Sequence, residues 1–412
     1  MATRPKKSAD EKPATKAKKA PSKTKEAATP KKTAAKASKG KTPNPVAKAT
    51  NASLVTGFPG FLATHLMLEL LDRDPSADYH FVIEARFDAE ARKRIERLRR
   101  ERPAFTGRLE IHHGDITKPM LGFEESTFDA LRADITHVWH LAALYDLAVP
   151  EEIAYRVNVR GTAHVLDFCE ACSRLRRLNY VSTCFVSGKR TGRIREDELD
   201  EGQAHHNHYE STKFWAEMEV QRRMGTLPVT IFRPSIVVGH SRTGETDKYD
   251  GPYYLLKIIK RMPKWLPFVN IGRGETVVNI IPVDFAAASI AYLGLLDGTE
   301  GQVFQVADAN PMRARDIVAL GLRFLGKPAA VGMIPPGLAE RAMKSDTLER
   351  TLGVPRQILG YFTHDARYDT ANLARHLQGA GIKCPHLSTY LQVLVDYYEA
   401  HSDRTFLDGR RV

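Results

Sequence analysis

Three residues near the middle of the chain have the types and the spacing of a proton-transfer site. Tyr209 and Lys213 occur in YESTK, and a spacing of four places both side chains on one face of a helix. An ammonium group beside a phenol favours the phenolate, so Lys213 would lower the pKa of Tyr209 towards neutral pH. Tyr209 would then be a usable general acid or base. Thr183, in YVSTCFVSG, could hold a substrate oxygen by a hydrogen bond. We predict that Thr183, Tyr209 and Lys213 are catalytic.

A glycine-rich segment much earlier in the chain has the pattern of a phosphate-binding turn. TGFPGFLA, residues 56–63, follows an apolar strand pattern and opens a helix pattern. Gly57 permits a tight turn, Gly60 lets the backbone approach a pyrophosphate, and Ala63 is small enough to pack a helix against a strand. The amides and the dipole of the helix N-terminus attract phosphate. The predicted cofactor contacts here are Gly57, Phe58, Pro59, Gly60, Phe61 and Leu62.

The end of the next predicted strand, FVIEARF, contains the residues that would select the cofactor. Glu84 could accept hydrogen bonds from a free ribose, which favours NAD, whereas Arg86 could pair with a 2′-phosphate, which favours NADP. Because side chains alternate along a strand, both residues share a face, and Arg86 lies nearer the carboxyl end. Arg94 on the following helix would add a second positive charge. We predict NADPH as the cofactor, with NAD as the alternative.

Two further strand ends carry residues suited to a bound dinucleotide. Asp115 in HHGDIT could accept a hydrogen bond from adenine, although the same sequence suits a helix cap. Ala142 and Ala143 in HLAA leave room for sugar and phosphates. Asn158 in NVRGT suits a catalytic water contact or a buried role towards the backbone equally well. The remaining predicted cofactor contacts are Ile116, Lys213 and Pro234.

The elements that must position these residues alternate between strand and helix patterns. Strands are expected at HFVIEAR, LEIHHGD, THVWHLAA, RLNYVSTCFVSG and VTIFRPSIVVG, and helices at 88–101, 128–132, 154–172 and 209–223. This alternation predicts an α/β fold with a doubly wound parallel sheet, known as a Rossmann fold. We expect VTIFRPSIVVG, residues 229–239, to be the last clear strand of its core.

This pattern divides the chain into three parts. Residues 1–51 form a Lys/Ala/Pro-rich tail, residues 52–300 the nucleotide-binding domain, and residues 301–412 a smaller substrate-binding cap. Residues 240–275 are rich in Gly, Pro and aromatic residues and are expected to be an insertion that joins the cap. Within it, LLKIIKRMPKWLPF alternates basic and apolar residues; a pocket lid or a packed cap helix is favoured over a helix lying on a membrane.

The net charge of the chain belongs to its first 50 residues. They hold 15 Lys and Arg against 3 acidic residues, whereas the remainder holds 46 of each sign, so the tail accounts for the formal net charge of +12. With almost no large apolar residue, this tail cannot offset the entropy of ordering, and we predict that it is disordered. Its lysines would contact nucleic acid or anionic membrane non-specifically, or would only aid solubility.

No metal site is predicted from the histidines and cysteines. His205, His206 and His208 in AHHNHY have no carboxylate or cysteine partner at ligand spacing, which favours a solvated loop. Cys169 and Cys172 form a lone CxxC inside a helix pattern and are expected to be buried thiols. Four cysteines in a chain of this length suit a reducing compartment, and we expect a cytoplasmic protein.

Taken together, TGFPGFLA, HLAA, NVRGT, YVSTCFVSG, YESTK and FRPSIVVG resemble the extended short-chain dehydrogenases/reductases. EARFDAEARKRI, GDITKPMLGF, VSTCFVSG, LPVTIFRPSIVVG and IIPVDFAA are similar to its male-sterility-type branch, which includes fatty acyl-CoA reductases and thioester-reductase domains. The resemblance covers about residues 53–290. It implies a Rossmann fold, NADPH and the roles given above to Thr183, Tyr209 and Lys213.

The expected reaction is reduction of a lipophilic acyl-CoA or carrier-bound thioester. Two other functions stay open at this point. One is an NAD-dependent sugar-nucleotide epimerase or dehydratase, or a hydroxysteroid-type dehydrogenase, on the same scaffold. The other is a non-enzymatic NADP-binding regulator held by the basic tail, which an intact Thr183, Tyr209 and Lys213 set argues against.

Overall fold

A parallel sheet of seven strands lies at the centre of the part of the chain that the computed structural model describes, residues 51–145, 150–247, 249–263, 265–335, 337–338, 341 and 364–401. Its order is β12-β7-β5-β4-β1-β2-β3, so the direction of winding reverses between β1 and β4. The strands are β1 (Ala52–Thr56), β2 (Asp78–Ile83), β3 (Leu109–His113), β4 (His137–His140), β5 (Arg177–Val181), β7 (Val229–Pro234) and β12 (Gln302–Val306). Such a reversal leaves a ligand-binding crevice at the carboxyl ends of the strands. The doubly wound α/β prediction is confirmed.

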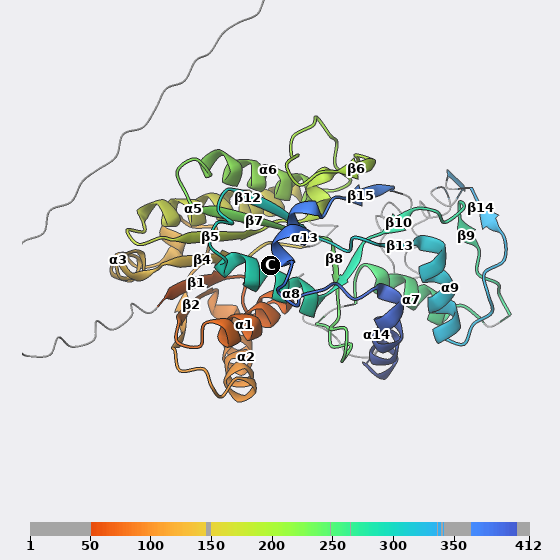
Figure 1. The fold of residues 1–412 in the computed structure, drawn as a ribbon, viewed down its shortest axis with the longest axis horizontal. Helices are drawn as coiled ribbons and strands as arrows, with labels where there is room; N and C mark the ends of the chain where they lie inside the picture. The colour runs from red at the N-terminus through yellow and green to blue at the C-terminus, as the bar shows by residue number, and fades with distance from the viewer. Residues whose placement is uncertain are drawn as a thin grey trace, which may run out of the picture. The chain divides into compact units, whose positions relative to one another are not determined.

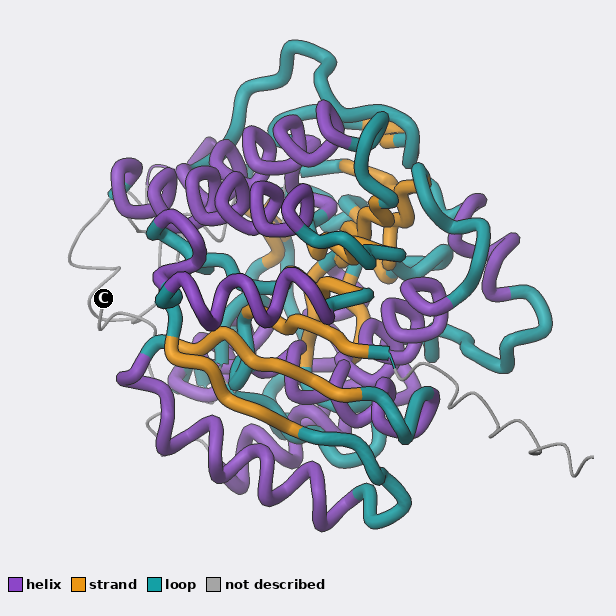
Figure 2. Tube along the Cα trace, turned by 90° about the vertical axis from the view of Figure 1, so that its left-hand side faces the viewer, coloured by secondary structure: helices purple, strands orange, loops and turns teal. Residues whose placement is uncertain are grey.

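Helices cover both faces of this sheet, and Figures 1 and 2 show the strands running between two helical layers. One face is covered by α1 (Phe61–Arg73), α2 (Asp88–Glu101), α8 (Val283–Leu295) and α13 (Ala371–Leu377). The other is covered by α3 (Glu125–Asp134), α5 (Gly161–Ala171) and α6 (His208–Arg223). Each layer has its own apolar core, with Leu66 and Phe81 in the first and Leu54 and Leu166 in the second.

The sequence explains why these elements form. The inner strands are buried on both faces and therefore have almost continuous apolar sequences, as in ASLVT of β1. Helix α2 is charged nearly throughout, and only Ala91 and Leu98 are buried. Its first turn contains Asp88 and Glu90 and its last turn two arginines, which complements the helix dipole.

Two expected boundaries are wrong. The strand HFVIEAR ends at Ile83, because Glu84 caps a short 3₁₀ helix, Ala85–Phe87, that turns the chain into α2. The nucleotide-binding domain does not end at residue 300, because β12 pairs with β7 in parallel as the outermost strand of the sheet. Leu373 and Leu377 of α13 also belong to the core of the first layer.

The cap is assembled from segments that lie far apart in the sequence. Helices α7 (Pro252–Arg261), α9 (Ala314–Phe324) and α14 (Leu387–His401) share one apolar core, to which Ile259, Ile317 and Leu391 contribute. Short strands border it, with β8 (Ile236–Val238) parallel to β11 (Ile280–Pro282) and β10 (Val277–Val278) antiparallel to β13 (Met312–Arg313). The insertion and the C-terminal region thus pack together.

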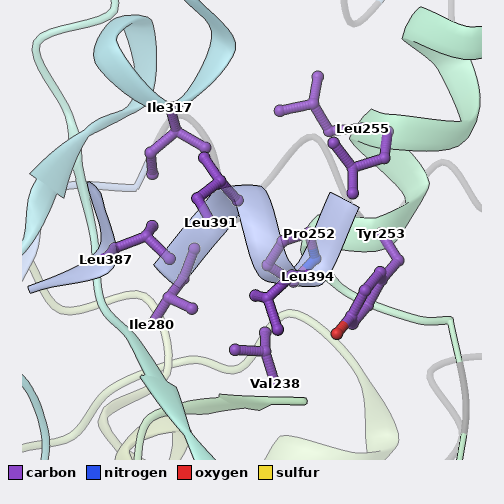
Figure 3. A pocket seen from close by; sticks show the side chains of 10 residues that line it. Val238, Pro252, Tyr253, Leu255, Ile280, Ile317, Leu387, Leu391 and Leu394 are labelled. Atoms are coloured by element: carbon purple, nitrogen blue, oxygen red, sulfur yellow. The ribbon is translucent and has the colours of Figure 1, made fainter. Parts of the chain in front are cut away.

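A small apolar cavity lies inside this cap core. Figure 3 shows side chains from β8, α7, β11, α9 and α14 pointing towards one another around it. Its one polar group at the wall, the Tyr253 hydroxyl, accepts a hydrogen bond from the Gly239 amide at 3.1 Å. No predicted catalytic or cofactor residue lines this cavity, so we assign it to the packing of the cap.

Two expectations concern the rest of the chain. The predicted disordered tail, residues 1–51, lies outside the described residues except for Asn51. Among the described helices, none combines the length and the apolar character that a bilayer crossing requires.

Candidate active site

The glycine-rich turn forms as predicted between β1 and α1. Gly57 has φ +85°, and a Cβ there would lie 2.7 Å from the Ala142 amide nitrogen, so no other residue fits without strain. A Cβ on Gly60 would lie 2.7 Å from the Gly57 carbonyl oxygen. Helix α1 begins directly afterwards at Phe61, which leaves its first amides without partners in the helix. Phe58 is turned inward and stacks on Phe81 with ring centroids 4.3 Å apart, so only its backbone faces the turn.

A buried polar chain holds the end of β4 against this turn. Thr56 Oγ1 accepts from the Ala142 amide at 3.2 Å and bonds His140 Nδ1 at 2.7 Å. His140 Nε2 in turn bonds Thr162 Oγ1 of α5 at 3.0 Å. Burial, with a smaller contribution from the nearby Lys213 charge, lowers the pKa of His140 to about 3. The imidazole is therefore neutral, and its two hydrogen bonds connect Thr56 at the end of β1 with Thr162 in α5.

Asn158 also has a positioning role. Its side-chain oxygen accepts from the Leu144 amide at 2.8 Å, and its side-chain nitrogen donates to Thr212 Oγ1 of α6 at 3.0 Å. The residue is 1% exposed, so these bonds satisfy it within the core. Of the two roles left open for Asn158, the structure favours the support of the backbone that follows Ala142 and Ala143.

Thr183 and Tyr209 meet at the carboxyl ends of β5 and β7. Helix α6 starts after Asn207, whose side chain caps it by accepting from the Glu210 amide at 3.0 Å. This start places Tyr209 in the first turn, where the Thr183 side chain is near enough to oppose the rise in the pKa of Tyr209. Thr183 Oγ1 donates to the Pro234 carbonyl at 3.4 Å, so Thr183 lies beside the predicted cofactor contact Pro234 at the end of β7.

Lys213 does not act on Tyr209 as we expected. Its ammonium donates to the Tyr180 hydroxyl at 3.0 Å and to the Val181 carbonyl at 2.9 Å. Burial raises the pKa of Tyr209 above its usual range, and Glu210 and Asp250 raise it further, while the Thr183 hydrogen bond opposes them. The expected lowering of the Tyr209 pKa is thus wrong, because desolvation dominates at a side chain that is 8% exposed.

Burial also acts on Lys213 itself. It lowers the pKa of Lys213 to about 7, although the Glu217 carboxylate one turn later raises it. Glu217 is held by a buried ion pair with Arg233 of β7, in which Nη2 and Oε1 are 2.5 Å apart. Ser182 donates to the same carboxylate at 2.5 Å. The predicted site residues do not include Glu217, Arg233 or Tyr180, although Glu217 stands four residues after Lys213 on the same helix face.

At the adenosine end, the two residues expected to compete for the cofactor bind each other. Arg86 Nη2 donates to Glu84 Oε1 at 2.9 Å, and the two side chains are 39% and 44% exposed. Strand alternation does not relate these two side chains, because β2 ends at Ile83. Arg86 remains at the carboxyl end of β2 with its guanidinium 4.7 Å from the Phe87 ring centroid.

Two predicted cofactor contacts have structural partners instead. Arg94 donates to Asp247 at 2.7 Å and to Glu90 at 2.8 Å, so it ties α2 to the segment after β8 rather than offering a free charge. Asp115 Oδ1 accepts from the Thr117 amide at 2.9 Å and from its hydroxyl at 2.7 Å, which stabilises a turn, whereas the helix that follows is preceded by Lys118 and is not capped by Asp115. Ile116 packs against Gly161, since a Cβ added to Gly161 would lie 2.8 Å from Cδ1 of Ile116.

The three clustered histidines take separate partners. His206 Nδ1 bonds Glu210 Oε2 at 3.0 Å, and the His205 ring lies 4.9 Å from that of Phe214. His208 opens α6. Among the described residues they do not form a group that could hold a metal ion.

A nicotinamide dinucleotide fits the residues at the switch point. The glycines let the turn pack closely against Leu141 and Ala142, and a 13-residue helix starts directly after it, so amides of the helix N-terminus are available to a pyrophosphate. Gly57 to Leu62 would hold the phosphates, Ala142 and Ala143 would line the sugars, and Thr183 and Tyr209 would face the reactive end. Lys213 is engaged by Tyr180 and Val181, and its predicted contact with the ribose stays a prediction.

Comparisons with known proteins agree with this geometry. The family model of the male sterility protein matches residues 55–290. A putative fatty acyl-CoA reductase of Drosophila melanogaster is 26% identical over 60% of this chain and 52% of its own length. A glycine betaine reductase of Emericella nidulans is 29% identical over 67% of this chain and 22% of its own length. The chain therefore spans about half or less of these curated relatives.

A solved structure covers more of the molecule. The terminal R domain from the myxalamid biosynthetic pathway superposes with a TM-score of 0.72 at 26% identity, over 88% of this chain and 94% of that domain. Its fold thus extends beyond the nucleotide-binding part into the cap. The chain belongs to the male sterility protein family, and its Rossmann domain is that of an NAD(P)-dependent oxidoreductase which resembles acyl-CoA and thioester reductases.

Proposed function

We propose that the chain is an NADPH-dependent reductase of fatty acyl thioesters, carried on coenzyme A or on a carrier protein. The observation that supports this most is the pair formed by Tyr209 and Thr183 at the carboxyl ends of β5 and β7, beside the glycine-rich turn. Fatty acyl-CoA reductases and the R domain of a synthetase pathway are among its relatives, which favours a thioester as the substrate.

The chain's own groups suit the reductive direction. A reduced nicotinamide dinucleotide supplies a hydride when it is bound. Negative charge then develops on the carbonyl oxygen of the substrate, and hydroxyl donors from Thr183 and Tyr209 would stabilise it. Because burial raises the pKa of Tyr209, the phenol keeps its proton at neutral pH and is available as the proton donor.

The hydrogen bond from Thr183 to Pro234 does not prevent Thr183 from binding a substrate oxygen. At 3.4 Å it is long for an O–H···O hydrogen bond, so the Thr183 hydroxyl can turn to a substrate oxygen at little cost. A supporting role, without contact to the substrate, is proposed for Lys213, Tyr180 and Glu217. Water would be excluded by the aromatic edge of Tyr145, whose ring centroid lies 4.9 Å from that of Tyr209.

A substrate screen tests the proposal. The full chain is incubated with NADPH or NADH and with a long-chain acyl-CoA, a fatty aldehyde or a UDP-sugar, and loss of the reduced cofactor is followed by absorbance. We expect oxidation of NADPH with the acyl-CoA and release of free thiol. Turnover of the UDP-sugar alone, with NAD retained through purification, would identify an epimerase instead.

The basic tail is a separate proposal. Residues 1–50 would bind nucleic acid or anionic lipid through counterion release, and would localise a cytoplasmic enzyme without taking part in its chemistry. A chain lacking residues 1–50 should keep the melting temperature and turnover of the full chain and lose salt-sensitive adhesion to DNA or anionic vesicles. Equal adhesion of both forms would remove this role.

A further inference from the structure

Two histidines and a glutamate lie together on the outer strands of the sheet, outside the candidate active site. His80 is in β2, and Glu110 and His112 are in β3, the edge strand. The register pairs His80 with Glu110 directly, and His112 follows two residues later on the same face. Three potential ligands therefore project from one face of neighbouring strands.

The distances within this cluster are those of a metal-binding site. His80 Nδ1 and His112 Nε2 are 2.9 Å apart, and Glu110 Oε2 lies 3.5 Å from the first and 3.8 Å from the second. A tetrahedral zinc ion with bonds of about 2.0–2.1 Å spaces its ligand atoms about 3.4 Å apart. The three atoms thus need to move by only a few tenths of an ångström to hold such an ion.

The surroundings orient the ligand atoms towards one another. Arg108 donates to Glu110 Oε1 at 2.9 Å, which leaves Oε2 facing the two imidazoles. His80 is 5% exposed, and its Nε2 is buried with no hydrogen-bond partner in the described part of the chain. The Nδ1 atom of the same ring bonds His112 Nε2. One proton shared between these two nitrogens occupies the place that a divalent cation would take.

We propose that His80, Glu110 and His112 bind a zinc ion that fastens the edge strand β3 to β2. Two imidazoles and one carboxylate are ligands that zinc prefers, and solvent can supply the fourth position because Glu110 is 37% exposed. The ion would bind the folded chain only, since the ligands come together through strand pairing, and it would therefore stabilise the fold.

Zinc binding to the full chain tests the proposal. The chain is treated with a chelator and dialysed, and zinc is titrated by calorimetry while the melting temperature is followed. The unmodified chain should take up one equivalent and melt at a higher temperature with zinc. His112→Ala and Glu110→Gln should each weaken binding at least tenfold. His113→Ala is the matched control, because His113 is 56% exposed, pairs with Asp88 and points to the other face of β3.

Each outcome either supports or overturns the proposed zinc site. Loss of binding in His112→Ala or Glu110→Gln, with normal binding in His113→Ala, supports the site. Circular dichroism shows which variants fold, and Glu110→Gln decides alone if the histidine variant does not. Failure of the unmodified chain to bind zinc overturns the proposal. So does zinc binding that folded His112→Ala and Glu110→Gln chains retain in full, since the ion must then lie elsewhere.

Discussion

Burial at Tyr209 changes what its hydroxyl can do. An exposed phenol beside a lysine would lean towards the phenolate, but Tyr209 is 8% exposed and its pKa is raised. A phenol that keeps its proton donates it to an oxygen that gains charge, as a carbonyl does on reduction. The local electrostatics therefore keep Tyr209 in the protonated form that a general acid needs.

At the adenosine end, the ion pair between Glu84 and Arg86 leads to a test of cofactor choice. Arg86→Ala should narrow the preference for NADPH over NADH about tenfold or more, because a charge-assisted contact with the 2′-phosphate is lost. Glu84→Ala should widen the preference, since it releases Arg86 from a bond of 2.9 Å.

Dissociation constants for both cofactors, measured by fluorescence with the two variants and the unmodified chain, check this prediction. Arg92→Ala is a suitable control, because Arg92 is 64% exposed on α2 and pairs with Asp88. Equal affinity of the unmodified chain for NADPH and NADH would assign the choice to Glu84 instead.

At the scale of the element, the glycine-rich turn depends on the absence of a side chain. In Gly57→Ala the new Cβ meets backbone atoms of Leu141 and Ala142 at 2.7 Å in a conformation with φ +85°, so β4 must move away. We expect at least a tenfold loss of dinucleotide affinity and a lower melting temperature.

Gly202→Ala provides the comparison for that change. Gly202 also has positive φ, at +71°, but nothing lies within 4 Å of its Cβ position. It should show only the cost of the backbone conformation, about 1 kcal/mol, and unchanged cofactor affinity. Similar cofactor affinity in Gly57→Ala and the unmodified chain would show that the turn does not approach the dinucleotide.

The elements show which features the sequence could predict. Helix α2 is expected at 88–101 and is found there, because acids at its start and arginines at its end mark both termini. Helix α6 starts one residue before its predicted position, at His208. The end of β2 is missed because periodicity cannot distinguish a strand residue from the cap of a following 3₁₀ helix.

Pairings between distant segments could not be predicted from local patterns. The place of β12 beside β7 depends on contacts with residues about 70 positions earlier, which no local pattern reveals. The partners of Lys213 are missed for the same reason, since Tyr180 reaches it from β5. Motif spacing identified the residues that we predict to be catalytic, whereas the pKa values of Tyr209 and Lys213 depend on burial that only the fold defines.

At the scale of the whole molecule, buried histidines make the fold sensitive to acid. Burial lowers the pKa of His65 and of His137 to about 4 and that of His140 to about 3. Between pH 6.5 and these values, the unfolded chain binds protons that the folded chain does not. The free energy of unfolding should therefore fall as the pH falls through this range, by about 1.4 kcal/mol per pH unit for each histidine.

Denaturant unfolding at a series of pH values from above 7.5 down to about 5 checks this expectation. In His140→Asn the stability should fall less steeply with decreasing pH than in the unmodified chain, whatever its absolute value. The slope above pH 7.5, where these histidines are neutral in both states, serves as the internal control. Identical slopes below pH 6.5 would show that His140 is protonated in the folded state.

The central claim is that Tyr209 donates a proton to a thioester substrate during reduction by NADPH. The most direct measurement compares turnover and NADPH affinity in Tyr209→Phe and in the unmodified chain, with the best acyl thioester of the screen. Tyr292→Phe on α8 controls for the loss of a phenol elsewhere. We predict that Tyr209→Phe loses about a hundredfold or more in turnover and keeps its NADPH affinity within a few fold. Turnover within a few fold of the unmodified chain would contradict the mechanism.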